Sequence, residues 1–512
     1  MTGPEAVIGG AEEEIGRDAF AARAARGAGA LRALGIGPGD VVAAVTRNDL
    51  GALEAMQAAA DSGATFCPLN WHGAAPEIGA ILDDCAAKTV IIHRDLIAPL
   101  AGALRGRQIV AVTPGAAIRA AYGVTAAAAA DRPDIPEWAA LRDAAAPLEP
   151  EMMRPILRYT SGSTGMPKGI RRSSAGPAKD YRATLRRLGT EMMRMRPGAR
   201  FLTAAPLYHS APSSLTAMAM ALPGVSAKAL PRFDAEGFLA AIAEWRATHV
   251  YLVPAMMSRM LKLPAEVKAR HDLSSVEFCL TTGSPFPHDL KRAMIDWWGP
   301  VFWESYGASE IGFMTMASSE EAMARPGTAG RVQLGGSILI LGPDGEPLPA
   351  GEVGDIHVKI DAYPAFDYSN DPAGGGVLLR HGHASVGDMG WLDGDGYLFI
   401  SDRKKDMIIS GGANIFPAEI EAALIEAPFI ADAAVFGAPD EEFGERIVAA
   451  IQPAPGWTPD RGEVAAWLDG RLARMKHPRV IDFHDALPRE DTGKIFKARL
   501  RAPYWEGAGR KI

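Results

Sequence analysis

The sequence predicts an α/β fold: a large N-terminal domain of two helix-covered sheets and a small β-barrel-like subdomain, then a small, mobile α+β C-terminal domain. Strand-like and helix-like segments alternate in two separate blocks, as in helix-covered parallel sheets. Short strand-like runs between Gly-Pro and Asp-Gly turns follow them. A length of 512 residues suffices for about three structural units. We place the domains at residues 1–402 and 403–512.

The first alternating block covers residues 19–142. Alanine-rich residues 17–34 have helical spacing, and the glycine-rich turn that follows leads into the apolar strand 40–45. Residues 53–62 again have helical spacing, and 88–92 form a second apolar run. Both short runs are bounded by turn residues, which favours buried strands.

The second alternating block covers residues 200–306. Its expected strands are 201–204, 249–253 and 276–280, with helices between them such as 238–246. Beyond Gly312 the pattern changes: residues 330–360 predict short strands, and residues 403–512 a smaller α+β region.

Composition and charge narrow the class of protein. The net charge of −8 gives no general attraction to nucleic acid. Three cysteines without a CxxC spacing are expected to be buried thiols in a reducing cytoplasm. The acidic N-terminus does not resemble a signal peptide. The most apolar stretch, 215–225, is about half the ~20 residues that span a bilayer, so we expect no integral membrane contact. Oligomeric state stays open, with a homodimer as one expectation.

Residues 159–169 are the most informative stretch. Glycines let backbone N–H groups approach an anion, hydroxyls add donors and Lys168 adds a positive charge. Gly169 follows Lys168 where a Walker loop has Ser or Thr. This composition predicts a polyphosphate-binding loop; a Ser/Gly surface loop is the alternative. The candidate phosphate-binding residues are Thr160, Ser161, Gly162, Ser163, Thr164, Gly165 and Lys168.

This loop resembles the signature loop of the acyl-adenylating superfamily, which comprises acyl-CoA synthetases, nonribosomal adenylation domains and firefly-type luciferases. There the loop holds the β- and γ-phosphates of ATP. The resemblance continues in order through nearly the whole chain. It implies an AMP-forming ligase that uses ATP, Mg²⁺ and coenzyme A.

Further motifs carry nucleotide and metal roles by this resemblance. The turn 281–285 and the segment 302–310 would surround adenine and the α-phosphate, and Asp388 in Val-Gly-Asp would bind the ribose hydroxyls. Ser309 stands where the family usually has Thr and keeps the hydroxyl for the α-phosphate. Val386 stands where the family usually has Thr or Ser, so the loss of one polar contact of the nucleotide is expected there. Mg²⁺ would be bound by Thr164 and Glu310. The additional nucleotide-binding residues are Gly283, Ser284, Pro285, Glu304, Ser305, Tyr306, Gly307, Ser309 and Asp388.

The resemblance also implies the reacting and moving parts. His209, in Tyr-His-Ser, would line the path of the carboxylate; a buried structural histidine is the equal alternative. Arg403 would contact ribose or phosphate, Lys405 would be the hinge, and Lys494 would reach the carboxylate and the α-phosphate. The residues next to coenzyme A would be Ser410, Gly411, Gly412 and Lys476.

The substrate is expected to be a small carboxylic acid. A pocket near His209, Ser213, Met218, Val253, Gly307 and Met314 looks apolar, which favours a fatty, aryl or polycyclic acid. An amino acid is disfavoured, because the segment 208–210 lacks the acid that would hold its ammonium group. Three alternatives remain: a stand-alone enzyme that loads a carrier protein, a luciferase-like oxygenase, and a catalytically silent nucleotide binder.

Overall fold

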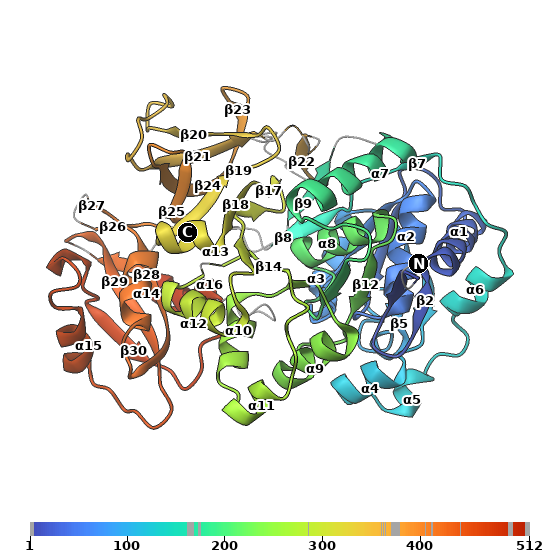
Figure 1. Ribbon diagram of the computed structural model, residues 1–512, viewed down its shortest axis with the longest axis horizontal. Helices are drawn as coiled ribbons and strands as arrows, with labels where there is room; N and C mark the ends of the chain where they lie inside the picture. The colour runs from blue at the N-terminus through green and yellow to red at the C-terminus, as the bar shows by residue number, and fades with distance from the viewer. Residues whose placement is uncertain are drawn as a thin grey trace.

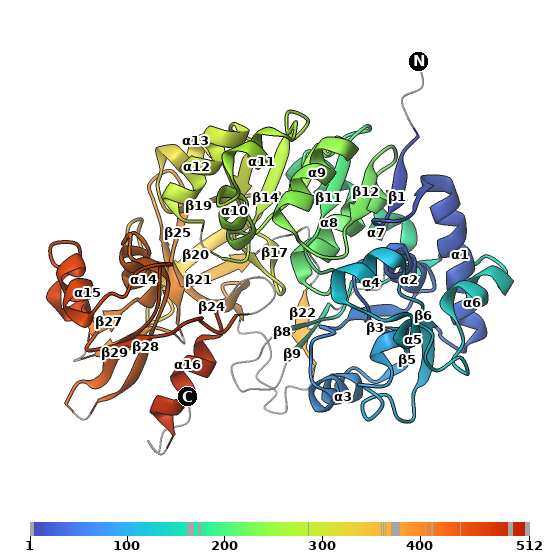
Figure 2. The same cartoon turned by 90° about the horizontal axis from the view of Figure 1, so that it is seen from below.

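The computed structural model describes residues 5–160, 168–172, 176–284, 286–359, 361, 363, 365–369, 379–404, 406–410, 413–440, 442–489 and 495–506. Figures 1 and 2 show three parts in line along the long axis. The N-terminal sheet lies at one end, the central sheet in the middle and the C-terminal region at the other end. In Figure 1 the gold antiparallel strands, among them β20 and β21, lie above the place where the central sheet meets the C-terminal region.

The N-terminal sheet is parallel, in the order β4-β3-β5-β6. Strand β3 of this sheet is buried on both faces. Val42 and Ala44 belong to the core shared with the central sheet, whereas Val41, Ala43 and Val45 face a second core. A strand covered on both sides needs a continuous apolar run, which explains its sequence. The strand bounds are β3 Val41–Val45, β4 Thr65–Pro68, β5 Ala87–His93 and β6 Gln108–Val112.

The central sheet has a parallel part and an antiparallel continuation. Strands β1, β12, β11, β13, β14 and β15 are parallel neighbours, and β2 pairs with β1 antiparallel at the edge. Beyond β15 the order continues antiparallel as β18-β19-β25-β24-β21-β20. The expected small β subdomain is therefore joined edge to edge to the central sheet. The bounds are β1 Val7–Gly9, β2 Glu14–Gly16, β11 Arg200–Thr203, β12 Ser226–Ala229, β13 His249–Tyr251, β14 Phe278–Thr281, β15 Phe302–Glu304, β18 Thr315–Ser318, β19 Thr328–Val332, β20 Ser337–Leu341, β21 Gly354–Lys359, β24 His383–Leu392 and β25 Tyr397–Arg403.

Smaller strand groups complete the large region. Strands β22, β9 and β8 form a three-stranded antiparallel sheet. In sequence, β8 leads into the phosphate loop and β9 begins at its lysine, whereas β22 comes much later in the chain. The bounds are β7 Met152–Met153, β8 Arg158–Thr160, β9 Lys168–Arg172, β10 Gly176–Pro177, β16 Gly307–Ala308, β17 Gly312–Phe313, β22 Phe366–Tyr368 and β23 Leu379–Arg380.

Helices cover the sheets and fill the connections between parallel strands. No helix in the described part of the chain is long and apolar enough to cross a bilayer. The bounds are α1 Arg17–Ala33, α2 Leu50–Asp61, α3 Ala75–Asp84, α4 Ala116–Tyr122, α5 Ala126–Ala129, α6 Trp138–Ala144, α7 Ala178–Arg187, α8 Ser210–Ala221, α9 Ala235–Trp245, α10 Pro254–Leu261, α11 Ala265–Ala269, α12 His288–Trp298 and α13 Ser319–Ala324.

The C-terminal region has its own sheet and its own core. The sheet order is β27-β26-β29-β28, with β30 parallel to β29. Ile420 and Leu424 of α14 pack with Val435 and Ile451 of the long β28–β29 hairpin. The bounds are β26 Ile408–Ser410, β27 Ala413–Ile415, α14 Pro417–Ile425, β28 Ile430–Asp440, β29 Gly444–Pro453, α15 Arg461–Leu468, β30 Val480–Phe483 and α16 Lys497–Trp505.

The alternation expected from the sequence is confirmed in both blocks, with small shifts at the ends. The helix expected at 53–62 begins at Leu50, because the Asp49 carboxylate accepts a hydrogen bond from the backbone N–H of Ala52 at 2.7 Å. This is an N-cap, which fixes where a helix starts. The expected strand 249–253 ends at Tyr251, because Pro254 opens α10 three residues later.

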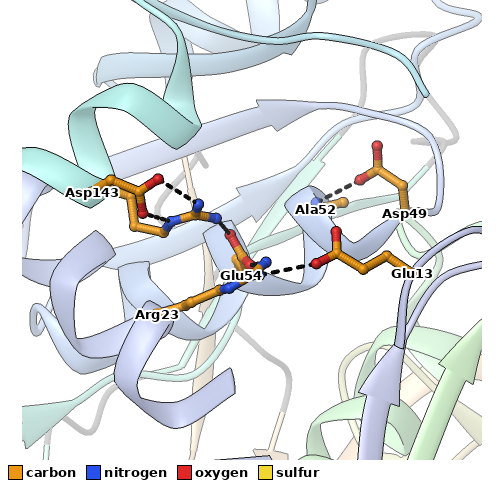
Figure 3. Close-up of polar contacts among 7 residues, drawn as sticks. Glu13, Arg23, Asp49, Ala52, Glu54 and Asp143 are labelled. Atoms are coloured by element: carbon orange, nitrogen blue, oxygen red, sulfur yellow. Dashed lines mark hydrogen bonds and ion pairs between the residues drawn. The ribbon is translucent and has the colours of Figure 1, made fainter. Parts of the chain in front are cut away.

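A buried ion-pair cluster joins the N-terminal helices (Figure 3). Glu54 of α2 has a side chain that is 1% exposed, and it receives Arg142 from α6 and Arg23 from α1 at 3.2 Å. Asp143 accepts from Nε and Nη2 of Arg142, and Glu13 accepts from Nη2 of Arg23. Each charge in the cluster therefore has a partner of opposite sign, as burial requires.

Candidate active site

The parallel strands of the central sheet end at one edge, and the expected site segments follow them there. Tyr208 and His209 lie beyond β11, Val253 beyond β13, Gly283 and Ser284 beyond β14. Tyr306 follows β15. Ligands of open α/β sheets bind outside the carboxyl ends of the strands. The topology therefore gathers segments that are up to about a hundred residues apart in sequence.

The turn after β14 is tied to the segment after β15. The Thr282 hydroxyl donates to the Ser305 carbonyl at 2.7 Å, and the Ser305 N–H donates to the Thr281 carbonyl at 3.0 Å. Gly283 has φ of +89°, a left-handed conformation that favours glycine. Gly283, Ser284 and Ser305 thus lie together.

Glu304, expected near the nucleotide, has a protein partner. Its carboxylate accepts from Lys291 of α12 at 2.6 Å; the Lys291 side chain is buried and that of Glu304 is mostly buried. Burial raises the pKa of Glu304, and the Lys291 ammonium opposes that shift. The carboxylate is thus fixed toward α12, and its nucleotide role stays a prediction.

Tyr306, Asp388 and Arg403 form one connected group. The Tyr306 hydroxyl donates to Asp388 Oδ2 at 2.7 Å, and Arg403 Nε lies 3.3 Å from Asp388 Oδ1. Asp388 and Arg403 are register partners on β24 and β25. Burial and the Asp388 carboxylate raise the pKa of Tyr306, so its phenol stays protonated and donates. Residues 82 positions apart are brought into direct contact.

Tyr368 connects the lysine of the phosphate loop with the expected magnesium ligand. Its hydroxyl donates to Glu310 Oε1 at 3.2 Å, and the Lys168 ammonium lies 5.5 Å from the centre of its ring. The backbone next to Glu310 is also fixed, because Arg172 donates to the carbonyls of Ser309 and Glu310 at 3.1 and 2.9 Å. The sheet β22-β9-β8 therefore lies against the segment 306–310.

The segment before His209 is held in place by a residue that follows strand β3 of the N-terminal sheet. Asn48, which is 2% exposed, donates to the carbonyls of Ala205 and Leu230 and accepts from the Leu207 N–H at 2.9 Å. His209 comes directly before α8, and its carbonyl accepts from the Ser213 hydroxyl at 2.8 Å.

For several predicted residues the structure gives a position in the fold but no contact with the groups described above. Gly307 pairs with Phe313 in the β16–β17 hairpin, Thr160 pairs with Lys168, and Ser410 ends β26. Lys476, expected near coenzyme A, places its ammonium 2.6 Å from both oxygens of Glu419. The predicted residues outside the described part of the chain are Ser161, Gly162, Ser163, Thr164, Gly165, Pro285, Lys405, Gly411, Gly412 and Lys494.

Sequence reasoning missed four residues at this site: Asn48, Arg172 and Tyr368, described above, and Arg158, which donates to the Ser214 hydroxyl of α8 at 2.7 Å. Only Arg158 had a local signal, since it is a charged residue in the apolar run just before the phosphate loop. The others acquire their roles through contacts made far along the chain.

Comparison with known proteins identifies the family. The family model described as AMP-binding enzyme matches residues 3–362, and the model for the C-terminal domain of the same enzymes matches residues 419–494. The chain belongs to the AMP-binding enzymes.

Relatives of this AMP-binding enzyme include acid–CoA ligases. It is 35% identical to a feruloyl-CoA synthase of Amycolatopsis, over 94% of this chain and 92% of that protein. It is 34% identical to an indoleacetate–CoA ligase of Aromatoleum aromaticum, over 96% and 93%. Among solved structures, ATP-bound MatB of Rhodopseudomonas palustris superposes with a TM-score of 0.82 at 27% identity, over 100% of this chain and 98% of that one.

ATP, Mg²⁺ and coenzyme A are the cofactors of this family, and the described residues fit the first two. Asp388 presents a buried carboxylate, suited to hydroxyl donors, beside Tyr306. No cluster of three or more His, Cys, Asp or Glu in the described part of the chain could hold a metal alone. Mg²⁺ bound with nucleotide phosphates needs only one or two carboxylates, and Glu310 supplies one.

Proposed function

We infer that this AMP-binding enzyme activates a carboxylic acid with ATP as an acyl-adenylate, releases pyrophosphate, and then transfers the acyl group to coenzyme A with release of AMP. The convergence of Lys168, Glu310, Tyr306, Asp388 and Arg403 carries this conclusion. These residues come from separate segments, and contacts through Tyr368 and Asp388 join them in two groups.

The adenylation step depends on position and charge. The acid is already an anion at neutral pH and can attack the α-phosphorus without a general base. The barrier arises because two anions must meet, so electrostatic stabilisation dominates. In this proposal Lys168 neutralises the departing pyrophosphate, and Asp388 and Arg403 fix the ribose. Lys494 neutralises the carboxylate and the α-phosphate. Mg²⁺ at Glu310 and Thr164 would supply further charge neutralisation.

The second step uses the C-terminal region from residue 403 onward. Lys494 must leave so that a thiol can approach the adenylate, and Lys405 would be the hinge. The neighbouring Asp402 carboxylate accepts from the backbone N–H of Ala418 at 2.9 Å and lies near Lys497. Lys497 Nζ is in turn 2.7 Å from Glu421 Oε1. These contacts join the proposed hinge to α14 and α16. A rotation about Lys405 would rearrange the contact between Asp402 and Ala418, which lie on either side of it in sequence.

The proposal also covers the acyl acceptor, the cellular compartment and the oligomeric state. Coenzyme A is favoured over a carrier protein, because the relatives reported above are CoA ligases. The cysteines of the described chain carry free, buried thiols, in keeping with a reducing cytoplasm. A homodimer remains a prediction that the molecular mass in solution would test.

ATP–pyrophosphate exchange with a panel of carboxylic acids tests the first step. We expect acid-dependent exchange, and AMP release when coenzyme A is added. If AMP were released only on addition of a carrier protein with a free thiol, the acceptor would be that carrier protein and not coenzyme A. A protein that binds ATP but exchanges no pyrophosphate with any acid would overturn the enzymatic proposal. Lys494→Ala should abolish exchange while retaining ATP binding.

A further inference from the structure

One face of the sheet β22-β9-β8 is cationic. Thr160 pairs with Lys168 and Arg158 pairs with Ile170, so these side chains share a face. Arg172 lies two residues beyond Ile170 on the same strand and therefore shares that face too. Tyr159 and Ser369 lie on the opposite face, where both hydroxyls bond to Asp84. The face with Lys168 thus continues away from the phosphate loop with two arginines.

Arg158 has no acidic partner among the described residues. Its Nη2 donates to the Ser214 hydroxyl at 2.7 Å and lies 3.5 Å from that of Ser213. Its Nε is buried and has no hydrogen-bond partner. The ionisable groups that act on it are Arg172 and the phenols of Tyr181 and Tyr363, whose pKa values burial raises. No negative charge therefore faces Arg158 from these groups.

Burial and the neighbouring Arg172 lower the pKa of Arg158 to about 10. The guanidinium therefore still carries its charge at neutral pH. A buried charge without a counterion is costly, and so is a buried N–H without an acceptor.

Arg158 is half-buried with a buried Nε, and three buried arginines show what a guanidinium away from water normally requires. Arg47 bonds to both carboxylate oxygens of Asp95 at 3.0 and 2.9 Å. Arg94 lies 2.6 Å from Glu137, and Arg142 pairs with Glu54. Arg158 departs from this rule, which points to an anion supplied from outside the chain.

The position of Arg158 indicates which anion. Ser213 and Ser214 lie in the first turns of α8, directly after Tyr208 and His209. That helix also carries Met218, expected as a wall of the acyl pocket. Arg158 therefore reaches the helix that is expected to line the acyl pocket, whereas Arg172 is held at the carbonyls of Ser309 and Glu310.

We propose that Arg158 is a specificity residue that binds a second oxyanion group on the acid, so that the substrate is an apolar acid with a distant second carboxylate. This inference rests on the proposed function and revises the expectation of a wholly apolar substrate. A carboxylate matches the planar guanidinium and would accept from Nε and one Nη. Sulfonate or phosphonate in its place would be bound by the same chemistry.

The competing role for Arg158 is ATP phosphate binding, since Thr160 lies two residues along the same face. The two roles predict different kinetic changes. A residue for the acid alters the choice between acids and the KM of the acid. A residue for phosphate alters the KM of ATP for every acid.

The test measures ATP–pyrophosphate exchange with suberic and terephthalic acids against their monomethyl esters. A long-chain monocarboxylic acid and an arylpropenoic acid test the proposed function independently. Wild type is compared with Arg158→Met and Arg158→Lys. Arg171→Met is the matched control, because Arg171 is exposed on the opposite face of the same strand.

We expect wild type and Arg171→Met to favour one diacid over its half ester at least about tenfold in kcat/KM, the scale of one charge-assisted contact. Arg158→Met should bring that ratio to within about twofold of unity and leave the KM of ATP unchanged, while Arg158→Lys keeps part of the ratio. Should Arg158→Met fail to fold, the test rests on the diacid to half-ester ratio of the wild type and on its reduction in Arg158→Lys.

Equal rates for diacid and half ester in wild type would overturn the inference. So would a ratio that survives Arg158→Met, or a raised KM of ATP with an unchanged ratio. Exchange with monocarboxylic acids alone would overturn it while leaving the proposed function intact. No exchange with any acid would refute the proposed function itself.

Discussion

Removing the hydroxyl of Tyr306 should weaken ATP binding without unfolding the enzyme. Tyr306 is 7% exposed and donates to Asp388, which is 5% exposed and has Arg403 as its other described partner. Hydrogen bonds to charged groups contribute roughly 1.5–3 kcal/mol, and about 1.4 kcal/mol corresponds to a factor of ten. If that bond positions Asp388 for the ribose, Tyr306→Phe should raise the Kd of ATP roughly tenfold or more.

The assay is calorimetric titration of ATP, together with the KM of ATP in pyrophosphate exchange. Tyr397→Phe is the matched control, because the Tyr397 hydroxyl likewise donates to a carboxylate, Glu321, at 2.8 Å. We expect that control to change only stability. If Tyr306→Phe bound ATP within twofold of wild type while folded, the placement of the Tyr306–Asp388 pair in the nucleotide site would be refuted.

The remaining predictions concern packing and titration. Gly307→Ala should reduce exchange activity at least about tenfold, because a Cβ there would lie 2.1 Å from the Gly312 carbonyl oxygen and the hairpin would have to separate. Arg142→Met should destabilise the enzyme by about 3 kcal/mol, since Glu54 would keep a buried charge with only a weaker partner; a lower urea midpoint, partly restored by adding Glu54→Leu, would confirm it. Burial lowers the pKa of His249 from 6.5 to about 4, so the unfolded chain binds more protons and stability should fall as pH drops from 6.5 toward 4. Urea midpoints at pH 7 and pH 5 should show this loss in wild type and less of it in His249→Gln.

The sequence was sufficient to predict the sheets, because their signals are local. The apolar run of β3 and the turns around it predict a strand buried on both faces, and the structure confirms it. The boundaries were less accurate where a single side chain decides them. Asp49 starts α2 three residues before the predicted helix, since a cap is a contact that periodicity does not report.

The candidate site was predicted as motifs and not as contacts. The order of the motifs indicated Tyr306, Asp388 and Arg403, and the structure joins them. Nothing in the sequence indicates that Tyr368 lies between Lys168 and Glu310, or that Asn48 holds the segment before His209. These contacts form across sequence separations of 58 residues for Tyr368–Glu310 and 159 for Asn48–Leu207.

The distribution of charge at the site follows from the reaction. The enzyme must bring an acid anion to a polyanion, and cations on the face of the sheet β22-β9-β8 reduce that repulsion. The carboxylates of Glu310 and Asp388 lie at the segment next to this face, where a metal ion and hydroxyls need acceptors. Arg158 stays charged up to about pH 10. Arg158 therefore does not titrate in the acid range, and we expect the second pKa of the acid to set the pH at which the diacid preference disappears; kcat/KM ratios measured as a function of pH with two diacids of different second pKa would check this.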